Sequence, residues 1–114
     1  MKLPIKSSLF AVTALLSGFS VASQLNNVSV EAININKGLG AHLFIRTSAA
    51  PVQNGCHTDP NWNYVLPLND DLSKHIFSIL LAAQTSKAKV TLTGTGTCST
   101  WGVEYLTNIT ISSN

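Results

Sequence analysis

The sequence predicts a small, mostly β domain with five strands and one helix, preceded by a signal peptide. Three observations lead to this prediction. Apolar and polar residues alternate with a period of two in five segments, as expected for strands with one buried face. Another segment has the spacing of an amphipathic helix. The N-terminus is basic and then apolar, which is typical of exported precursors.

The N-terminal segment has the order of a secretory signal peptide. Lys2 and Lys6 precede an apolar run, Leu9 to Phe19, and small residues follow that run. The run has about a dozen residues, fewer than the roughly 20 that are needed to span a bilayer. We therefore expect a cleaved signal rather than a retained membrane anchor.

Cleavage would leave a secreted or periplasmic domain with no membrane span. Small residues precede the cut, and both Ala22 and Ser23 satisfy this requirement, so the sequence leaves the site open. We assign residues 1–23 to the signal peptide and residues 24–114 to a single domain.

The domain that remains has no net charge. Lys2 and Lys6 are two of the seven basic residues, and none of the five acidic residues lies in the signal, so five of each remain. Nucleic-acid binding normally requires clustered Lys and Arg side chains, and only Lys87 with Lys89 approaches a cluster. We therefore expect no nucleic-acid partner.

The two cysteines, Cys56 and Cys98, both lie in the part expected to be exported, where oxidation is permitted. A domain of about 90 residues has a modest core. Closing a loop of about 42 residues would stabilise it by roughly 4 kcal/mol on chain-entropy grounds. The alternative, a nucleophilic or metal-binding thiol, lacks a supporting spacing. We predict a structural disulfide.

The first two strands are predicted to form a hairpin. From residue 26 the alternation continues to residue 35 with a change of phase at Ala32-Ile33, which indicates a β-bulge. Turn residues at 37–40 separate this strand from a second alternating segment at 42–47.

A loop and a third strand follow the hairpin. Residues 48–61 are rich in Ala, Pro, Asn, Gly and Asp, which predicts irregular structure. Trp62, Tyr64 and Leu66 then alternate with their neighbours until Pro67, which has no backbone donor and ends the ladder.

The helix is predicted to begin at Asn69, Asp70 or Asp71, whose side chains can cap unpaired helical amides. Apolar residues follow at the offsets of one helical face, so we expect the helix to pack on the sheet. The residues on this face are Leu72, Ile76, Ile79, Leu80 and Ala83.

Two strands complete the domain. Residues 89–93 alternate and continue into a Gly/Thr-rich segment, and from Val103 to Ile111 the apolar residues keep a single period-two phase. The predicted order is strand, strand, strand, helix, strand, strand, which is the order of the oligonucleotide/oligosaccharide-binding barrel, or OB-fold.

A more specific resemblance lies in the second half of the chain. A Leu/Ala-rich helix, Ile79 to Gln84, leads through Ser86-Lys87-Ala88-Lys89 into the strand Val90-Thr91-Leu92, and Cys98 follows. This segment resembles the B subunits of bacterial AB-type toxins of the subtilase-cytotoxin-like family, in which that cysteine pairs with one upstream. The resemblance covers about residues 55–112.

The resemblance implies a secreted, five-stranded OB-fold-like barrel that binds host glycans and often assembles as a ring of five. The first two strands and their loop do not align with the family. Its sugar-contacting residues are therefore not transferred to this chain, and no companion toxin subunit is inferred.

The candidate ligand-binding residues come from the most polar and aromatic stretch and from a later turn. Aromatic faces pack on the apolar C–H side of sugar rings, while carboxylates and amides bind sugar hydroxyls. The candidates are His57, Asp59, Asn61, Trp62 and Trp101.

The alternative is a structural role for the same residues. Trp62 and Tyr64 would fill the core, His57 and Asp59 would face solvent, and Trp101 would pack over the disulfide.

No catalytic residue, metal site or cofactor is predicted. Neither His-Glu-x-x-His nor Gly-x-Ser-x-Gly occurs, and His57-x-Asp59 is an incomplete ligand set. The sequence favours a non-catalytic, glycan-binding module outside the cell. The alternative is a periplasmic or secreted protein-interaction or inhibitor domain that does not bind sugar.

Overall fold

Six strands and one α-helix make up residues 21–112, the part of the chain that the computed structural model describes. Residues 1–20, which hold most of the predicted signal peptide, and residues 113–114 lie outside the described residues. The elements are β1 (Gln24–Val28), β2 (Val30–Ile35), β3 (His42–Thr47), β4 (Tyr64–Pro67), α2 (Asp71–Ser86), β5 (Lys89–Cys98) and β6 (Glu104–Ser112). A short 3-10 turn joins β2 to β3.

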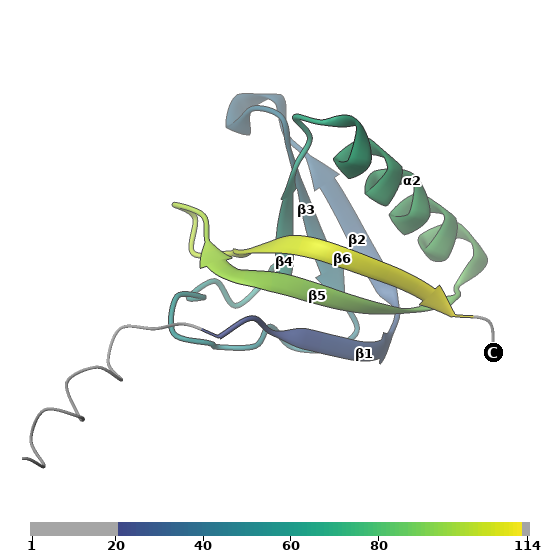
Figure 1. The fold of residues 1–114 in the computed structure, drawn as a ribbon, viewed down its shortest axis with the longest axis horizontal. Coiled ribbons are helices and arrows are strands. Elements are labelled where there is room, and N and C mark those ends of the chain that lie inside the picture. Colours follow the sequence, from purple (N-terminus) through teal and green to yellow (C-terminus); the bar gives the residue numbers. More distant parts are fainter. Residues whose placement is uncertain (1–20, 113–114) are drawn as a thin grey trace, which may run out of the picture.

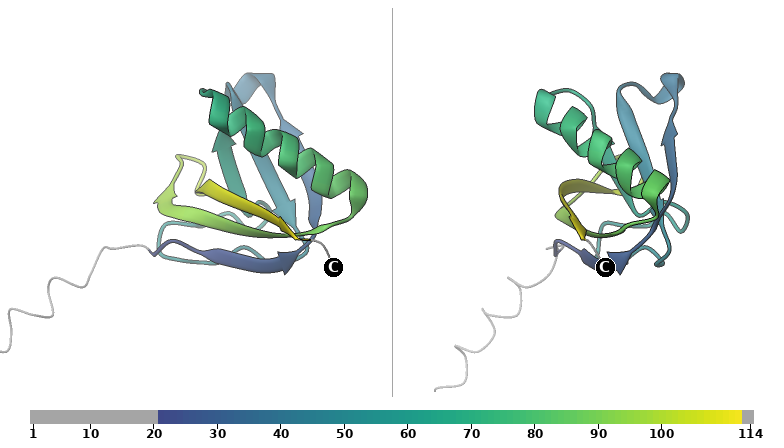
Figure 2. Two further views of the ribbon diagram at one scale, coloured as in Figure 1. Left: turned by 45° about the vertical axis from the view of Figure 1, so that its right-hand side comes forward. Right: turned by 90° about the vertical axis from the view of Figure 1, so that its right-hand side faces the viewer.

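The six strands form one curled sheet in the order β1-β5-β6-β4-β3-β2. All neighbours are antiparallel except β4 and β6, which are parallel. In Figure 1, β5 and β6 cross in front of the steeper β2, β3 and β4, so the sheet has the shape of a half-barrel. The views in Figure 2 show α2 lying across the open side of this curl, where it contacts β2 and β6.

The prediction of five strands is wrong, because the first predicted strand is divided into two. Val28 pairs with Val90 of β5, whereas Val30 pairs with Thr47 of β3, so the chain changes partner at Ser29. Asn27, just before this point, has a left-handed backbone with φ of 56°. A bulge does follow, but it lies between Val30 and Ala32 rather than at Ala32-Ile33.

The helix begins as predicted. Asp70 is its N-cap and accepts a hydrogen bond from the backbone N–H of Ser73 at 2.7 Å. This bond holds the pKa of the Asp70 carboxyl below its ordinary value of 3.8. Leu80 and Ala83 are fully buried, but Leu72, expected on the same face, is 70% exposed because the helix buries its second half over the core.

The sheet has an apolar cluster on each face, because successive side chains of a strand point in opposite directions. On β3, Leu43 and Ile45 point inward toward α2 and join the main core. Phe44 points outward and forms a second buried cluster with Val65 and Val103. The half-buried residues that pack on this outer cluster are Leu39, Trp62, Trp101 and Tyr105.

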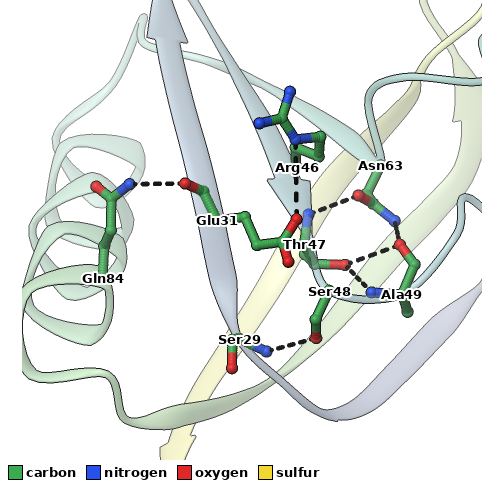
Figure 3. A network of polar contacts seen from close by, with 8 residues as sticks. All are labelled: Ser29, Glu31, Arg46, Thr47, Ser48, Ala49, Asn63 and Gln84. Carbon is green, nitrogen blue, oxygen red and sulfur yellow. Dashed lines mark hydrogen bonds and ion pairs between the residues drawn. The ribbon is translucent and has the colours of Figure 1, made fainter.

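The loop between β3 and β4 is fixed at its two ends by Asn63 (Figure 3). Its side-chain oxygen accepts from the backbone N–H of Thr47 at 2.7 Å, and its amide nitrogen donates to the carbonyl of Ala49 at 3.0 Å. Its own backbone N–H donates to Ile45 at 2.8 Å. One buried side chain therefore sets where the chain leaves β3 and where it enters β4.

A disulfide joins Cys56 in this loop to Cys98 at the end of β5, as predicted, with a Cα–Cα distance of 5.7 Å. Within residues 21–112, no helix combines the length and the apolar character that a membrane crossing requires.

Candidate functional site

The outer face of β3 carries an alternating series of aromatic and polar side chains. His42, Phe44 and Arg46 are spaced two residues apart and share this face. Asn34 of β2 is the register partner of Phe44, which brings its amide beside the aromatic ring. The face opposite α2 is therefore not a simple solvated surface.

Two tryptophans from distant loops meet on this face. The Trp101 ring centroid lies 5.2 Å from that of Phe44 and 4.9 Å from that of His42, both in edge-to-face geometry. The Trp62 ring lies 5.9 Å from Phe44, and the guanidinium carbon of Arg46 lies 5.7 Å from the Trp62 centroid. Aromatic pairs favour such offset contacts, so Phe44 holds both indoles in place.

A hollow of about 290 Å³ lies between these rings, and we call it the aromatic pocket. This is near the lower end of the volumes of small-molecule sites. The lining residues are Asn34, Asn36, Leu39, Phe44, Asp59, Trp62 and Trp101.

Asp59 supplies the carboxylate of the aromatic pocket. Its Oδ1 accepts from the backbone N–H groups of Asn61 at 2.7 Å and Trp62 at 2.9 Å, which closes a tight turn and orients the indole. Neither of these bonds uses Oδ2. The pocket thus combines two indoles with a carboxylate oxygen available to a ligand.

The turn that carries Trp101 is tied to the loop that carries Trp62. The carbonyl of Gly102 accepts from the backbone N–H groups of Thr58 at 2.9 Å and Asp59 at 3.1 Å. Gly102 has φ of +75°, and a Cβ there would collide with Oγ1 of Thr58. Only glycine both adopts this positive φ readily and leaves room for the Thr58 hydroxyl, so Gly102 fixes the distance between the two loops.

His57 is a second tie between the same segments, and it is buried. Its Nε2 donates to the carbonyl of Asp59 at 2.9 Å, and its Nδ1 accepts from the backbone N–H of Glu104 at 3.2 Å. Both ring nitrogens are therefore occupied within the protein. His57 supports the loop rather than lining the aromatic pocket.

The structure brings together three of the five residues predicted from the sequence. Asp59, Trp62 and Trp101 line the aromatic pocket, whereas Asn61 is exposed and outside the lining. The alternative gave the same residues structural roles. Of these roles, only that of Tyr64 agrees with the structure, since Tyr64 is 1% exposed and lies in the main core. Trp62 lies on the opposite side of the sheet.

Sequence reasoning missed the part of the aromatic pocket that β2 and β3 contribute. The alternation in β3 put Phe44 on the face opposite Leu43 and Ile45, so an outward aromatic ring was foreseeable. Nothing local indicated that Asn34 and Asn36 would lie next to it, because that depends on strand pairing.

A buried polar cluster lies on the other side of the sheet, around Glu104. The carboxylate is fully buried and accepts hydrogen bonds from Ser23, Asn54 and Gly96. The hydroxyl of Tyr64 is 2.7 Å from that of Ser23, and burial raises the pKa of this phenol above its ordinary value. The sequence offered no sign that Glu104 would be internal.

Two other hollows occur on the described surface, and neither contains an indole ring. The larger, of about 420 Å³, lies between β2 and the end of α2 and is bordered by Glu31, Gln84 and Lys87. The smaller, of about 240 Å³, lies between α2 and β6 beside Leu72 and Ile109. The aromatic pocket has the chemistry of a binding site even though it is not the largest hollow.

Within residues 21–112, no three or more His, Cys, Asp or Glu side chains are grouped so that they could hold a metal ion. Neither a protein-family model, nor a curated protein, nor a solved structure matches this chain. The function is therefore argued from the site itself.

Proposed function

We propose that this protein is a secreted or periplasmic, non-catalytic module that binds a glycan in the aromatic pocket. The observation that carries the proposal is the pair of half-buried indoles, Trp62 and Trp101, held around Phe44 beside a carboxylate and two amides. This combination matches the two chemical sides of a sugar.

The apolar side of a pyranose is its set of axial C–H bonds, and an indole face packs against it. The polar side is its ring of hydroxyls, which donate to carboxylates and both donate to and accept from amides. In the aromatic pocket, Asp59 provides the acceptor, and Asn34 and Asn36 provide the amides. Because the two kinds of group face one hollow, a single sugar residue would contact both.

The export part of the proposal rests on the N-terminal sequence and on the disulfide. A disulfide between Cys56 and Cys98 is compatible with an extracellular or periplasmic location, where such bonds persist. It also holds the Trp62 loop against the sheet, so oxidation would support the binding site as well as the fold.

The likeness to toxin B subunits supports the proposal through strand order. If β1 and β2 are counted as one bent strand, the chain has the strand, strand, strand, helix, strand, strand order of an OB-fold. In that interpretation the domain is an OB-fold-like barrel. Assembly as a ring of five, which the resemblance implies, belongs to the same proposal.

A glycan array probed with the purified, oxidised protein tests the sugar-binding proposal. Binding to a defined group of glycans is expected, and competition by the free sugar should remove it. An array without signal, together with recovery of a specific protein partner, would instead favour an interaction or inhibitor domain.

The assembly is tested separately by light scattering. A species of about five chains at micromolar concentration is expected from the resemblance. A strict monomer at that concentration would contradict the analogy with toxin subunits but would leave the sugar-binding test unaffected.

A further inference from the structure

Ser23, at the boundary of the predicted signal peptide, is docked on the buried carboxylate of Glu104. The backbone nitrogen of Ser23 donates to Oε2 of Glu104 at 3.1 Å, and its hydroxyl donates to Oε1 at 2.7 Å. The Ser23 carbonyl accepts from Gly94 of β5 at 2.9 Å. Ser23 is 7% exposed, whereas Val21 and Ala22 are exposed.

Glu104 lacks a positively charged partner in the described part of the chain. Its remaining contacts are the Asn54 side-chain amide, at 2.8 Å from Oε1, and the backbone N–H of Gly96, at 2.9 Å from Oε2. The one ion pair found within residues 21–112 joins Arg46 to Glu31 on the surface. A fully buried carboxylate normally requires a counter-charge, because its desolvation is costly.

Cleavage of the signal peptide would create that counter-charge at the required position. Hydrolysis of the Ala22–Ser23 peptide bond breaks the C–N bond and consumes one water. A carboxylate remains on Ala22, and the released amine of Ser23 takes up a proton to become an ammonium group. The nitrogen that donates to Glu104 as a neutral amide in the uncut chain would then carry a positive charge.

We propose that signal peptidase cuts between Ala22 and Ser23, and that the α-ammonium group of Ser23 is the internal counter-ion of Glu104. A cut after Ser23 would instead remove its hydroxyl and its amide, which are two of the four donors to the carboxylate. The structure thus distinguishes between the two sites that the sequence allows. This inference rests on the export part of the proposed function and is independent of sugar binding.

Cleavage of the signal peptide must also come before the domain completes its folding. The bond to be cut joins an exposed residue to a buried one, so the peptidase requires Ser23 to be undocked. Cleavage therefore precedes final folding, and the new N-terminus completes the Glu104 cluster. Asn54, which also donates to the Val21 carbonyl at 2.6 Å, keeps its bond to Glu104 after the signal is lost.

The first test is the intact mass of the protein exported from cells that carry the full sequence. A chain that begins at Ser23 is expected. A chain that begins at Gln24 or any other residue, or a chain that stays uncut, would overturn the assignment of the site.

The second test measures the pairing by thermal unfolding of chains prepared with defined first residues. A chain that begins at Ser23 is compared with one that begins at Ala22, in which the nitrogen of Ser23 is a neutral amide. We expect the chain that begins at Ser23 to have an unfolding temperature about 4–8 °C higher. This is the shift that 1 kcal/mol of added stability produces in a domain of this size. The same comparison with Glu104→Gln should lose most of the difference, whereas Glu31→Gln, a surface control, should keep it.

If Glu104→Gln does not fold, acetylation of the Ser23 amine provides the independent measurement. Acetylation removes the charge and leaves Glu104 intact, so the acetylated chain should unfold like the chain that begins at Ala22. Equal unfolding temperatures for the first two chains would refute the ion pair. A difference that survives Glu104→Gln or acetylation would do so as well.

Discussion

Gly94 lies directly against the side chain of Glu104, on the strand next to it. A Cβ at Gly94 would collide with Oε2 of Glu104 and would be 2.9 Å from Cε1 of Tyr64. The carboxylate has no room to move aside, because four hydrogen bonds from Ser23, Asn54 and Gly96 fix it. The absence of a side chain at position 94 is therefore a condition for burying Glu104.

Gly94→Ala should destabilise the fold by about 3 kcal/mol, the upper range for overpacking a core. Urea denaturation would measure the free energy of unfolding. Gly38→Ala is the matched control, because it lies in the exposed turn after β2 and approaches only the Asn36 side chain, at 3.2 Å. Equal stability of the two variants would contradict the packing around Glu104.

Trp101→Ala should weaken glycan binding about 10–30-fold, corresponding to about 1.4–2 kcal/mol. The reason is that it removes one aromatic wall of the pocket and leaves Phe44 uncovered. Trp62→Ala should act in the same direction. Asn61→Ala is the control, since Asn61 is in the same loop but outside the lining, and its binding should match that of the wild type. Titration calorimetry with a glycan found on the array would measure the affinities.

His57→Ala should lower the free energy of unfolding by about 1–3 kcal/mol, because the buried N–H of Glu104 loses its acceptor. It should also weaken glycan binding, since the Trp62 loop loses a tie to β6. His75→Ala changes an exposed histidine on α2 and should stay within about 0.5 kcal/mol of the wild type. Urea denaturation of both variants would measure their free energies of unfolding. A His57→Ala protein as stable as His75→Ala would contradict the anchoring role of His57.

Removal of the disulfide should lower the free energy of unfolding by about 4 kcal/mol, as expected for a closed loop of 42 residues. The double variant Cys56→Ser with Cys98→Ser and the reduced wild type should behave alike in chemical denaturation. A loss below about 1 kcal/mol would show that the hydrogen bonds at Gly102 and His57 hold the loop without the covalent bond.

The Asp70 cap should give the protein a stability that depends on pH. Because the backbone N–H of Ser73 lowers the pKa of Asp70 in the folded state, the unfolded chain binds more protons as the pH falls. The contribution is thus present above about pH 4 and is lost on further acidification. Asp70→Asn keeps an acceptor but does not titrate, so its unfolding temperature should fall less between pH 5 and about pH 2. Asp71→Asn, which leaves the cap intact, should follow the wild type.

Local rules were sufficient for the helix, its cap and the disulfide. Asp70 followed from capping chemistry, and the pairing of Cys56 with Cys98 followed from the cysteine count and the expected export. Trp62 and Trp101 both line the aromatic pocket, but the sequence placed Trp62 in the third strand, whereas it lies in the loop before β4. The helix and its cap depend on residues near one another in sequence. The disulfide could be predicted because two cysteines allow only one pairing.

The features that were missed depend on strand pairing. The change of partner at Ser29 leaves no local signal, because Val28 and Val30 alternate as in one strand. Thr93 of β5 pairs with Asn108 of β6, and the next residue, Gly94, pairs with Leu106. Thr107 is therefore an extra residue in β6, and the phase of β6 changes there. The single phase predicted from Val103 to Ile111 is therefore wrong.

That error has a particular effect on the predicted interior. A constant phase points Val103 and Tyr105 inward and leaves Glu104 on the surface. The bulge reverses this assignment, so that Glu104 and Leu106 face the interior and Tyr105 joins the outer cluster. A buried acid between apolar neighbours is the kind of residue that an alternation rule assigns to solvent.

The strand change at Ser29 also affects how the protein resists aggregation. It makes β1 and β2 the two outermost strands of the sheet, and each carries a register shift. The carbonyl of Glu31 on β2 accepts from the Gln84 side chain at 3.2 Å, so α2 covers part of the β2 edge. Irregular, partly covered borders are poor templates for adding a strand from another molecule. A concentrated solution of this protein would therefore be protected against growth into cross-β fibrils.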